Sequence, residues 1–418
     1  MKPPRELLAS MFHAAVKAAD PLAGMKAHLP AKPTGRTIVV GAGKGAAQMA
    51  CALETIWDGP LEGVVVTRYG YGCTTRDIKI VEASHPVPDA AGLNASAQLM
   101  KAVSNLSSGD LVIALICGGG SALLPAPPIG LTLQDEIVLN ESLLASGAPI
   151  SATNVIRKHL STIKGGRLAS ATKARVVTFV VSDIPGDNAS HVSSGPTVPD
   201  YSTRHEALEL VQRYDLKLPT AVITHLNSPD ADAPSPESLI FARNEVHIIA
   251  SAGMSLEAAA AVARSEGMEA AILSDSLEGE ADAVALFHAA IARETILNNR
   301  PFKKPVAIIS GGETTVTVRN KRGKGGRNGQ FALALAVALD GYDVDILAAD
   351  TDGTDGSESN AGAFADGRTV QRMRAAGLDA LHALSSNNSH AAFSSIGDLF
   401  ETGPTGTNVN DLRVILVQ

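Results

Sequence analysis

The sequence predicts an α/β protein, with a Rossmann-like parallel sheet in an N-terminal domain and a smaller α/β domain after it. Short β-branched runs alternate with alanine- and leucine-rich stretches at helical spacing. Several of the runs, such as LVIALI at 111–116, are apolar at every position. Strands of this kind are buried on both faces, as in a parallel sheet that helices cover on its two sides.

The predicted elements follow one another along the whole chain. Ten runs have the composition of strands, at 36–40, 63–67, 78–82, 111–116, 176–182, 246–250, 270–273, 306–310, 344–349 and 413–417. Helical patterns are found at 46–57, 92–104, 133–145, 154–163, 255–264, 281–297, 330–339 and 370–376. A further helix precedes the first strand, because apolar residues recur at helical spacing from Leu8 to Ala19.

A domain boundary is expected near residues 227–237, which are rich in Pro, Asp and Ser and lack apolar periodicity. We therefore expect a larger Rossmann-like domain over residues 1–225 and a smaller α/β domain over residues 226–418. The last strand could return from the second domain to the first.

Composition excludes several classes of protein. The chain has 418 residues with 35 basic and 43 acidic side chains, and its net charge of −8 excludes a broadly basic nucleic-acid binder. No apolar stretch reaches the roughly 18 residues that a membrane span needs. Cys51, Cys73 and Cys117 lack CxxC and metal-ligand spacings, so we expect reduced thiols in a cytoplasmic protein.

The first glycine-rich turn is TIVVGAGKGAAQMA, where Gly41-x-Gly43-x-x-Ala46 fits a dinucleotide-binding fingerprint. That fingerprint needs an acid at the end of the next strand, which here ends in Arg68. Lys44 lies inside the turn, and a cation beside helix N-terminal amides suits a terminal phosphate or a carboxylate. The alternative is a tight strand–helix packing turn with a solvated lysine.

Two further glycine turns follow buried strands; they consist of Gly118, Gly119, Gly120 and Ser121, and of Gly311, Gly312 and Glu313. Glycines let backbone amides turn toward a ligand, and ligands of open α/β sheets bind at strand carboxyl ends. The two turns are therefore expected to line opposite sides of one cleft. The GxxxxGK[ST] and protein-kinase signatures are missing from the sequence, so any phosphoryl transfer needs another architecture.

Two basic runs without acids, at 154–167 and 319–327, predict anion pockets in an acidic chain. Arg157 and Lys158 are candidates in the first run, where the alternative is a solvated basic face. Arg327 precedes a helix and is well placed to bind a phosphate with two N–H groups. Lys321 and its basic neighbours are instead typical of an exposed hairpin tip.

Carboxylates also follow two strands; they are Asp183 and Asp187, and Asp350, Asp352 and Asp355. Mg²⁺ commonly takes one or two carboxylates with phosphate oxygens and water, which makes Asp183 and Asp352 candidate metal ligands. The alternative for each is turn formation or helix capping. His85, in SHPVPD, is expected to be a turn residue.

Taken together, the motifs resemble the class II glycerate kinase family, whose C-terminal part is the MOFRL domain. They are VGAGKGA, SHPVPD, CGGGSALL, NVIRKHLSTIKGGRLA, SDIPGD, SSGPTVPD, SGGET, GGRNGQFALALA, DTDGTDG and TGPTGTNVNDL. The resemblance implies ATP-dependent phosphorylation of D-glycerate, usually to 2-phosphoglycerate, with Mg²⁺ in a cleft between the domains. It also implies that Lys44 and Arg327 are the main charged residues of that cleft.

The resulting hypothesis places ATP phosphates against the glycine turns, Gly43 included, with Lys44 and Arg327 neutralising the transferred group. Arg157, Lys158 and Ser121 are candidates for the glycerate carboxylate. Asp183 or Asp352 would hold Mg²⁺ or orient the attacking hydroxyl. The runner-up is a hydroxypyruvate reductase using NAD(P)H, and a third hypothesis is an anion-binding protein without turnover.

Overall fold

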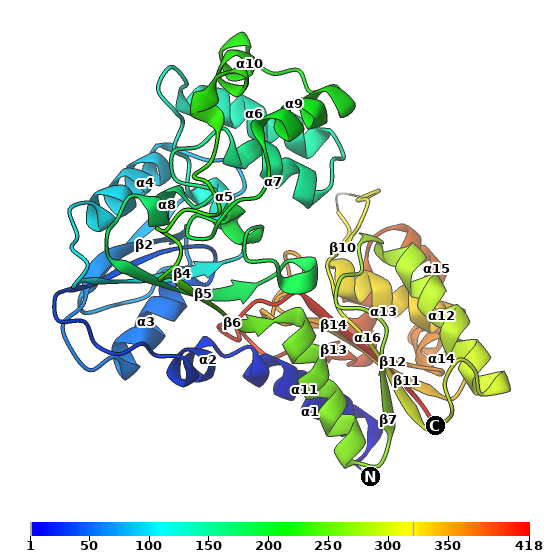
Figure 1. Cartoon of the computed structure of the whole chain (residues 1–418). Helices are drawn as coiled ribbons and strands as arrows, with labels where there is room; N and C mark the ends of the chain where they lie inside the picture. The colour runs from blue at the N-terminus through cyan, green and yellow to red at the C-terminus, as the bar shows by residue number, and fades with distance from the viewer. Residues whose placement is uncertain (1, 321) are drawn as a thin grey trace. The chain divides into compact units, whose positions relative to one another are not determined.

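Two six-stranded sheets organise the chain, one in each of two units, as the computed structural model shows (Figure 1). The structure describes residues 2–320 and 322–418, so Lys321 lies outside the described residues. One unit, the parallel-sheet unit, consists of residues 21–249. The other, the mixed-sheet unit, combines residues 1–20 with residues 250–418. No helix among the described residues is long and apolar enough to cross a membrane.

The parallel-sheet unit has the strand order β3-β2-β1-β4-β5-β6. Its strands are β1 (Thr37–Ala42), β2 (Glu62–Arg68), β3 (Ile78–Ala83), β4 (Leu111–Cys117), β5 (Arg175–Ser182) and β6 (Glu245–Ser251). Neighbours from β3 to β5 pair in parallel. Every residue of β4 is buried, which confirms the prediction of a strand covered on both faces. The carboxyl ends of these parallel strands therefore meet along one edge of the sheet.

The helices of this unit are α2 (Pro21–Ala27), α3 (Ala46–Ile56), α4 (Ala90–Val103), α5 (Gly120–Leu123), α6 (Leu133–Ala145), α7 (Ile150–Lys158), α8 (Arg167–Ser170), α9 (Arg204–Arg213) and α10 (Thr220–Asn227). Local capping begins α6, where Thr132 and Asp135 form a capping box. Helices α6, α7, α9 and α10 gather into one group and share an apolar core of their own (Figure 1).

The mixed-sheet unit has the strand order β13-β12-β11-β14-β9-β7. Its strands are β7 (Glu269–Ile272), β9 (Val306–Ser310), β11 (Val344–Asp350), β12 (Gly362–Asp366), β13 (Leu399–Phe400) and β14 (Asp411–Val417). Short strands β8 (Gly279–Glu280) and β10 (Thr314–Thr315) form a separate pair. β14 lies between β11 and β9, antiparallel to both, and is buried throughout.

Helices cover both faces of this second sheet. They are α1 (Pro4–Ala18), α11 (Ala252–Ser265), α12 (Ala281–Asn298), α13 (Arg327–Ala338), α14 (Thr369–Ala375), α15 (Ala380–Ser385) and α16 (Ser389–Ile396). One core joins α1 and α11 to the sheet, and another joins α12 and α13 to it. The predicted α/β class, with a parallel sheet followed by a second α/β domain, is thus confirmed.

The division of the chain differs from the expected boundary between residues 225 and 226. Helix α1 belongs to the mixed-sheet unit because Leu7, Met11 and Phe12 are buried in the core with α11. Residues 226–249 stay with the parallel-sheet unit, whose sheet β6 completes. The expected return of the last strand to the first domain is wrong, because β14 pairs only within the second sheet among the described strands. β12 was not predicted from the sequence.

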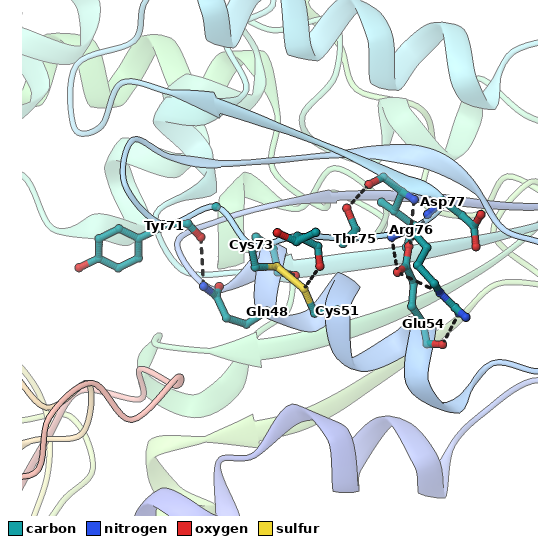
Figure 2. The surroundings of a disulfide bond; sticks show 12 residues. Gln48, Cys51, Glu54, Tyr71, Cys73, Thr75, Arg76 and Asp77 are labelled. Carbon is teal, nitrogen blue, oxygen red and sulfur yellow. Dashed lines mark hydrogen bonds and ion pairs between the residues drawn. A yellow bond between two sulfur atoms is a disulfide. The ribbon is translucent and has the colours of Figure 1, made fainter.

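The prediction of three reduced thiols is also wrong, because the structure joins Cys51 and Cys73 in a disulfide (Figure 2). Cys51 is on α3, and the chain before β3 is tied to that helix by Glu54, which accepts amide hydrogen bonds from Arg76, Asp77 and Ile78. A separation of 22 residues matches no motif, so the pairing arises from tertiary contact. A cytoplasmic location stays a prediction.

Candidate active site

Lys44 stands in the first glycine turn, between β1 and α3. The turn needs glycine at position 43, because φ is +134° and a Cβ there would lie 2.4 Å from the carbonyl oxygen of Cys117. Its amides are occupied within the protein: Gly43 N donates to Val66 O, Lys44 N to Gly118 O and Gly45 N to Cys117 Sγ. The expectation that these amides bind phosphate therefore fails, and the Lys44 side chain is what the turn offers an anion.

Gly119, in the second glycine turn, brings Lys44 and His85 together. Its φ is +80°, and a Cβ there would lie 3.0 Å from Lys44 Cγ and 3.2 Å from His85 Nε2. The bare Cα thus lets both side chains pack against the turn. His85 was expected only as a turn residue, and sequence reasoning missed its place beside Lys44.

Further basic groups lie near enough to His85 to influence its ring. Burial, followed by the charges of Lys44, Arg68 and Arg157, lowers the pKa of His85 to about 4, so its ring is neutral near pH 7. Arg68 ends β2, and its guanidinium lies 4.2 Å from the centre of the Tyr71 ring. Lys44, Arg68, His85 and Arg157 are here called the basic cluster. An excess of positive charge at the carboxyl edge of a parallel sheet suits an anionic ligand.

Hydroxyl groups connect the second turn to α7. Ser121 Oγ and Ser194 Oγ share a hydrogen bond of 2.8 Å, and Ser194 Oγ donates to Asn154 Oδ1 at 3.0 Å. Asn154 lies one helical turn before Arg157 on α7. Ser193 and Ser194 both have left-handed φ values, +52° and +58°, a strained conformation that tends to occur at functional sites. Both serines lie in SSGPTVPD, a motif of the family resemblance from which no role for them was predicted.

Asp183 lies at the same edge of the sheet. A Cβ on Gly118 would lie 1.8 Å from Asp183 Oδ2, so this carboxylate rests directly on the glycine turn. Both Asp183 and Lys44 lie near enough to Cys117 to influence its thiol, whose pKa burial raises to about 12. The structure thus brings Lys44, Asp183 and the turn 118–121 together.

Lys158 does not share this position. Its side chain is only 2% exposed, and Nζ donates to Asp200 Oδ1 at 3.0 Å. Lys164 is buried in the same way, 2.9 Å from Glu136 Oε1. Neither the expected anion pocket at Lys158 nor its alternative, a solvated basic face, describes these two lysines: both are buried within the protein, where each ammonium needs a carboxylate. Arg157 stays partly exposed and donates from Nε to Asn140 Oδ1 at 3.0 Å.

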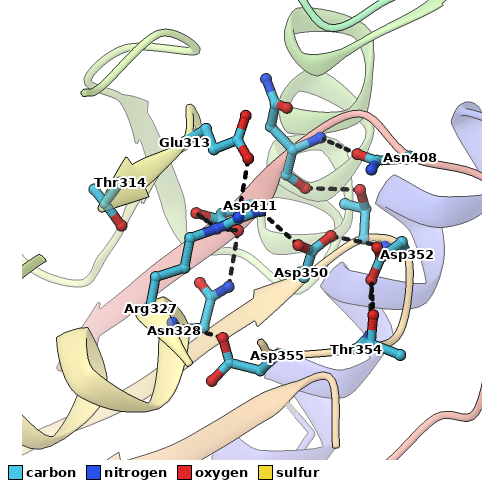
Figure 3. Close-up of polar contacts among 12 residues, drawn as sticks. Glu313, Thr314, Arg327, Asn328, Asp350, Asp352, Thr354, Asp355, Asn408 and Asp411 are labelled. Atoms are coloured by element: carbon cyan, nitrogen blue, oxygen red, sulfur yellow. Dashed lines mark hydrogen bonds and ion pairs between the residues drawn. The ribbon is translucent and has the colours of Figure 1, made fainter. Parts of the chain in front are cut away.

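In the mixed-sheet unit, Arg327 binds three carboxylates (Figure 3). Nε donates to both oxygens of Asp411 at 2.9 and 3.1 Å, one terminal nitrogen to Glu313 at 2.9 Å, and the other to Asp350 at 2.6 Å. Burial alone would lower the pKa of Arg327, but the charges of these three groups outweigh it and raise the pKa. The side chain is 24% exposed, and a guanidinium has five N–H groups, so capacity remains for a phosphate.

The start of α13 is occupied by Asp355. Its two oxygens accept hydrogen bonds from Asn328 N at 2.9 Å and Gly329 N at 2.7 Å. Burial raises the pKa of Asp355 to about 6, although the two amides work to lower it. The helix N-terminus is thus capped by a protein carboxylate, which corrects the expectation that it helps bind phosphate. The Arg327 side chain is the group at this position that stays a candidate anion ligand.

The other predicted groups of this unit also have partners within the protein. Gly311 N donates to Ser274 O at 2.8 Å, so this amide too is engaged. Asp352 accepts from Thr354 N and Oγ1 at 2.7 and 2.8 Å, which is the turn-forming alternative weighed for it. Within residues 2–320 and 322–418, no group of three or more His, Cys, Asp or Glu side chains is arranged to hold a metal ion.

Comparison with known proteins covers nearly the whole chain. Residues 7–227 match a family described as a domain of unknown function, DUF4147, and residues 306–411 match the MOFRL family. A relative from Agrobacterium vitis, named "Putative hydroxypyruvate reductase", is 46% identical over 99% of this chain and 94% of its own length. "D-glycerate 2-kinase" of Thermotoga maritima is 38% identical over 99% of this chain and 98% of its own length.

A solved structure agrees with these matches. The crystal structure of glycerate kinase from Thermotoga maritima superposes with a TM-score of 0.88 and 37% identity, over 99% of both chains. "Glycerate 2-kinase" of Pyrococcus horikoshii is 39% identical over 92% of this chain and 88% of its own length. The chain therefore belongs to the class II glycerate kinase family, with a DUF4147 part followed by a MOFRL part.

Proposed function

We propose that this protein transfers the γ-phosphoryl group of ATP to D-glycerate and forms 2-phosphoglycerate. The observation that carries the proposal is a pair of candidate anion ligands. Lys44 belongs to the basic cluster, and Arg327 is a partly exposed guanidinium paired with carboxylates. Both substrates are anions, and phosphoryl transfer depends mainly on positioning and charge neutralisation. The names of the relatives from Thermotoga maritima and Pyrococcus horikoshii support the 2-kinase activity.

In this proposal, Lys44 and Arg327 neutralise charge on the transferred group, an effect worth several kcal/mol or roughly 10³–10⁵ in rate. Arg157 and Ser121 bind the glycerate carboxylate, while buried Lys158 does not. Asp183 orients the attacking hydroxyl or supplies a ligand for nucleotide-bound Mg²⁺, for which Asp352 is the other candidate. Mg²⁺, when bound, would neutralise phosphate oxygens.

The glycine turns act differently from the first expectation. Because the amides of Gly43, Lys44 and Gly311 donate within the protein, side chains rather than these amides are proposed to bind the phosphates. Gly118 and Gly119 serve by leaving room for Asp183, Lys44 and His85. Lys44 and Arg327 belong to different units, so the proposal requires both units to contact one pair of bound substrates.

Phosphorus NMR of the product made from ATP, Mg²⁺ and D-glycerate tests the proposal directly. A 2-phosphoglycerate signal that appears only with the enzyme supports it, whereas a 3-phosphoglycerate signal corrects the regiochemistry. No phosphorylated product under any condition would refute it. The same preparation with hydroxypyruvate and NADPH, followed by nicotinamide absorbance, tests the reductase hypothesis; occupied amides in the first turn argue against that hypothesis.

A further inference from the structure

Arg413 is a charged side chain in the middle of the mixed sheet. It lies on the central strand β14 and none of its surface is exposed. Its guanidinium is paired with Asp411, two residues earlier on the same face of the strand, and lies 5.2 Å from the centre of the Phe331 ring. Burying an arginine is costly unless it is paired and hydrogen-bonded, so this position needs an explanation.

The same guanidinium holds the glycine turn after β9. One terminal nitrogen donates to Gly311 O at 3.1 Å, and the other donates to Thr314 Oγ1 at 3.1 Å. The backbone of β14 adds a bond from Asp411 N to Gly312 O at 3.2 Å. Arg413 therefore restrains the chain on both sides of Glu313, whose carboxylate contacts Arg327.

Asp411, the partner of Arg413, also binds Arg327 (Figure 3). Its carboxylate accepts from Arg327 Nε with both oxygens and from Asn328 Nδ2 at 2.8 Å. Asp411 thus lies between two guanidinium groups, one buried and one partly exposed. Because Nε is next to the last methylene carbon, its bonds to Asp411 determine where the outer N–H groups of Arg327 point.

We propose that Arg413 and Asp411 are positioning residues for Arg327. Arg413 orients the Asp411 carboxylate, Asp411 orients the Arg327 guanidinium, and Arg413 holds the turn that carries Glu313. Neither residue contacts substrate. The inference rests on the proposed function, in which Arg327 binds the transferred phosphoryl group.

A purely structural role predicts something different. Changing one partner of a buried ion pair lowers the stability of the fold, and if stability were the pair's only role, the folded variant would keep the wild-type kcat. A positioning role predicts that kcat falls while KM for ATP and for D-glycerate changes little, because misorientation of Arg327 is felt mainly in the transition state.

The test uses the full chain with ATP, Mg²⁺ and D-glycerate, and compares Asp411→Asn, Arg413→Met and Arg413→Lys with the wild type. Arg372→Met is the matched control, because Arg372 also pairs with two aspartates, Asp366 and Asp398, in the same unit. The first three variants are expected to lower kcat about tenfold or more with each KM within about threefold. The control is expected to keep the wild-type kcat.

A double-mutant cycle with Arg327→Lys separates the two proposals. If Asp411 acts through Arg327, adding Asp411→Asn to Arg327→Lys costs little beyond Arg327→Lys alone. If Arg327→Lys is defective while the Asp411 and Arg413 variants have the wild-type kcat, the positioning proposal alone is overturned. If Arg327→Lys is as active as the wild type, both proposals are overturned. Should Arg413→Met not fold, Arg413→Lys and Asp411→Asn decide in the same way.

Discussion

The backbone amide of Lys44 donates a 2.8 Å hydrogen bond to the carbonyl oxygen of Gly118. This bond joins the first two glycine turns of the parallel-sheet unit and orders the Lys44 side chain over Gly119. The first glycine turn has the sequence of a dinucleotide-binding motif, but its amides bond within the protein, and the turn instead positions the ammonium group of Lys44. In the proposed function, side-chain charge rather than these amides therefore recognises the anions.

Replacing Lys44 or Arg327 with alanine is expected to lower kcat/KM for glycerate phosphorylation by about 10³-fold or more, since each removes a charge from the proposed transition-state contacts. A coupled assay with ATP and D-glycerate measures the effect. Lys32→Ala is the control, because Lys32 pairs with Asp58 on the surface. Near wild-type kcat/KM in both site variants would remove these residues from the mechanism.

Gly119→Ala and Gly130→Ala form a matched pair. Both glycines have left-handed φ values, +80° and +89°, so each alanine carries a similar strain of roughly 1–2 kcal/mol. A methyl group at 119 would press on Lys44 and His85, whereas nothing lies within 4 Å of one at 130. We expect both to lower the melting temperature and Gly119→Ala alone to impair kinase activity. Equal activity of the two variants would contradict the proposed place of Lys44.

Anion binding is expected to raise the pKa of His85. In the structure that pKa is lowered to about 4 by burial and then by the charges of Lys44, Arg68 and Arg157, and a bound anion offsets those charges. Proton NMR of the His85 ring, titrated with and without inorganic phosphate or D-glycerate, measures the shift. A His85→Gln sample assigns the signal. An unchanged titration curve at saturating ligand would place the anion elsewhere.

Asp355→Asn is expected to change how stability depends on pH. The folded-state pKa of Asp355 is about 6, above its ordinary value of 3.8, so the folded chain holds this proton more tightly. The resulting stabilisation, about 3 kcal/mol, is fully present below pH 4 and is lost as pH rises through 6. Thermal unfolding of both proteins at pH 4.5 and 7.5 tests this. Between these two pH values the wild type should lose more stability than the variant, because the variant lacks the Asp355 carboxyl group. An identical change in melting temperature for the two proteins would contradict the argument that burial raises this pKa.

Removing the disulfide is expected to lower stability. The Cys51–Cys73 bond closes a loop of 22 residues, and constraining a loop of that length in the unfolded chain is worth about 3 kcal/mol. Cys51→Ser should therefore melt at a lower temperature than the wild type, with no further change on adding dithiothreitol. The wild type should fall toward the variant when reduced. A wild-type melting temperature that ignores the reductant would argue that the thiols are not joined.

Local patterns predicted a large part of this protein. Buried strands such as β4 and β5 were predictable because both faces of a parallel strand need apolar side chains. Lys44 stood out because it lies inside a strand–turn–helix motif, and Arg327 because it precedes a helix at the end of a basic run without acids. β12 escaped prediction because its five residues, Gly362–Asp366, resemble a loop until β11 pairs with them. The residues of the basic cluster come from three strand ends and from helix α7, so no single motif could indicate it.

By itself the sequence determined the α/β class, the positions of the glycine turns and the family, because these depend on residue types at short spacing. The tertiary structure decided which basic groups remain for a ligand: Lys158 is neutralised by Asp200, while Arg157 stays partly exposed. It also decided the cysteine pairing, the unit that contains α1 and β14, and the partners of the turn amides. The physical reason is that a charge, a thiol or an amide is available to a ligand only where folding leaves part of its bonding capacity exposed and unused, and the groups that use up this capacity are distant in the chain.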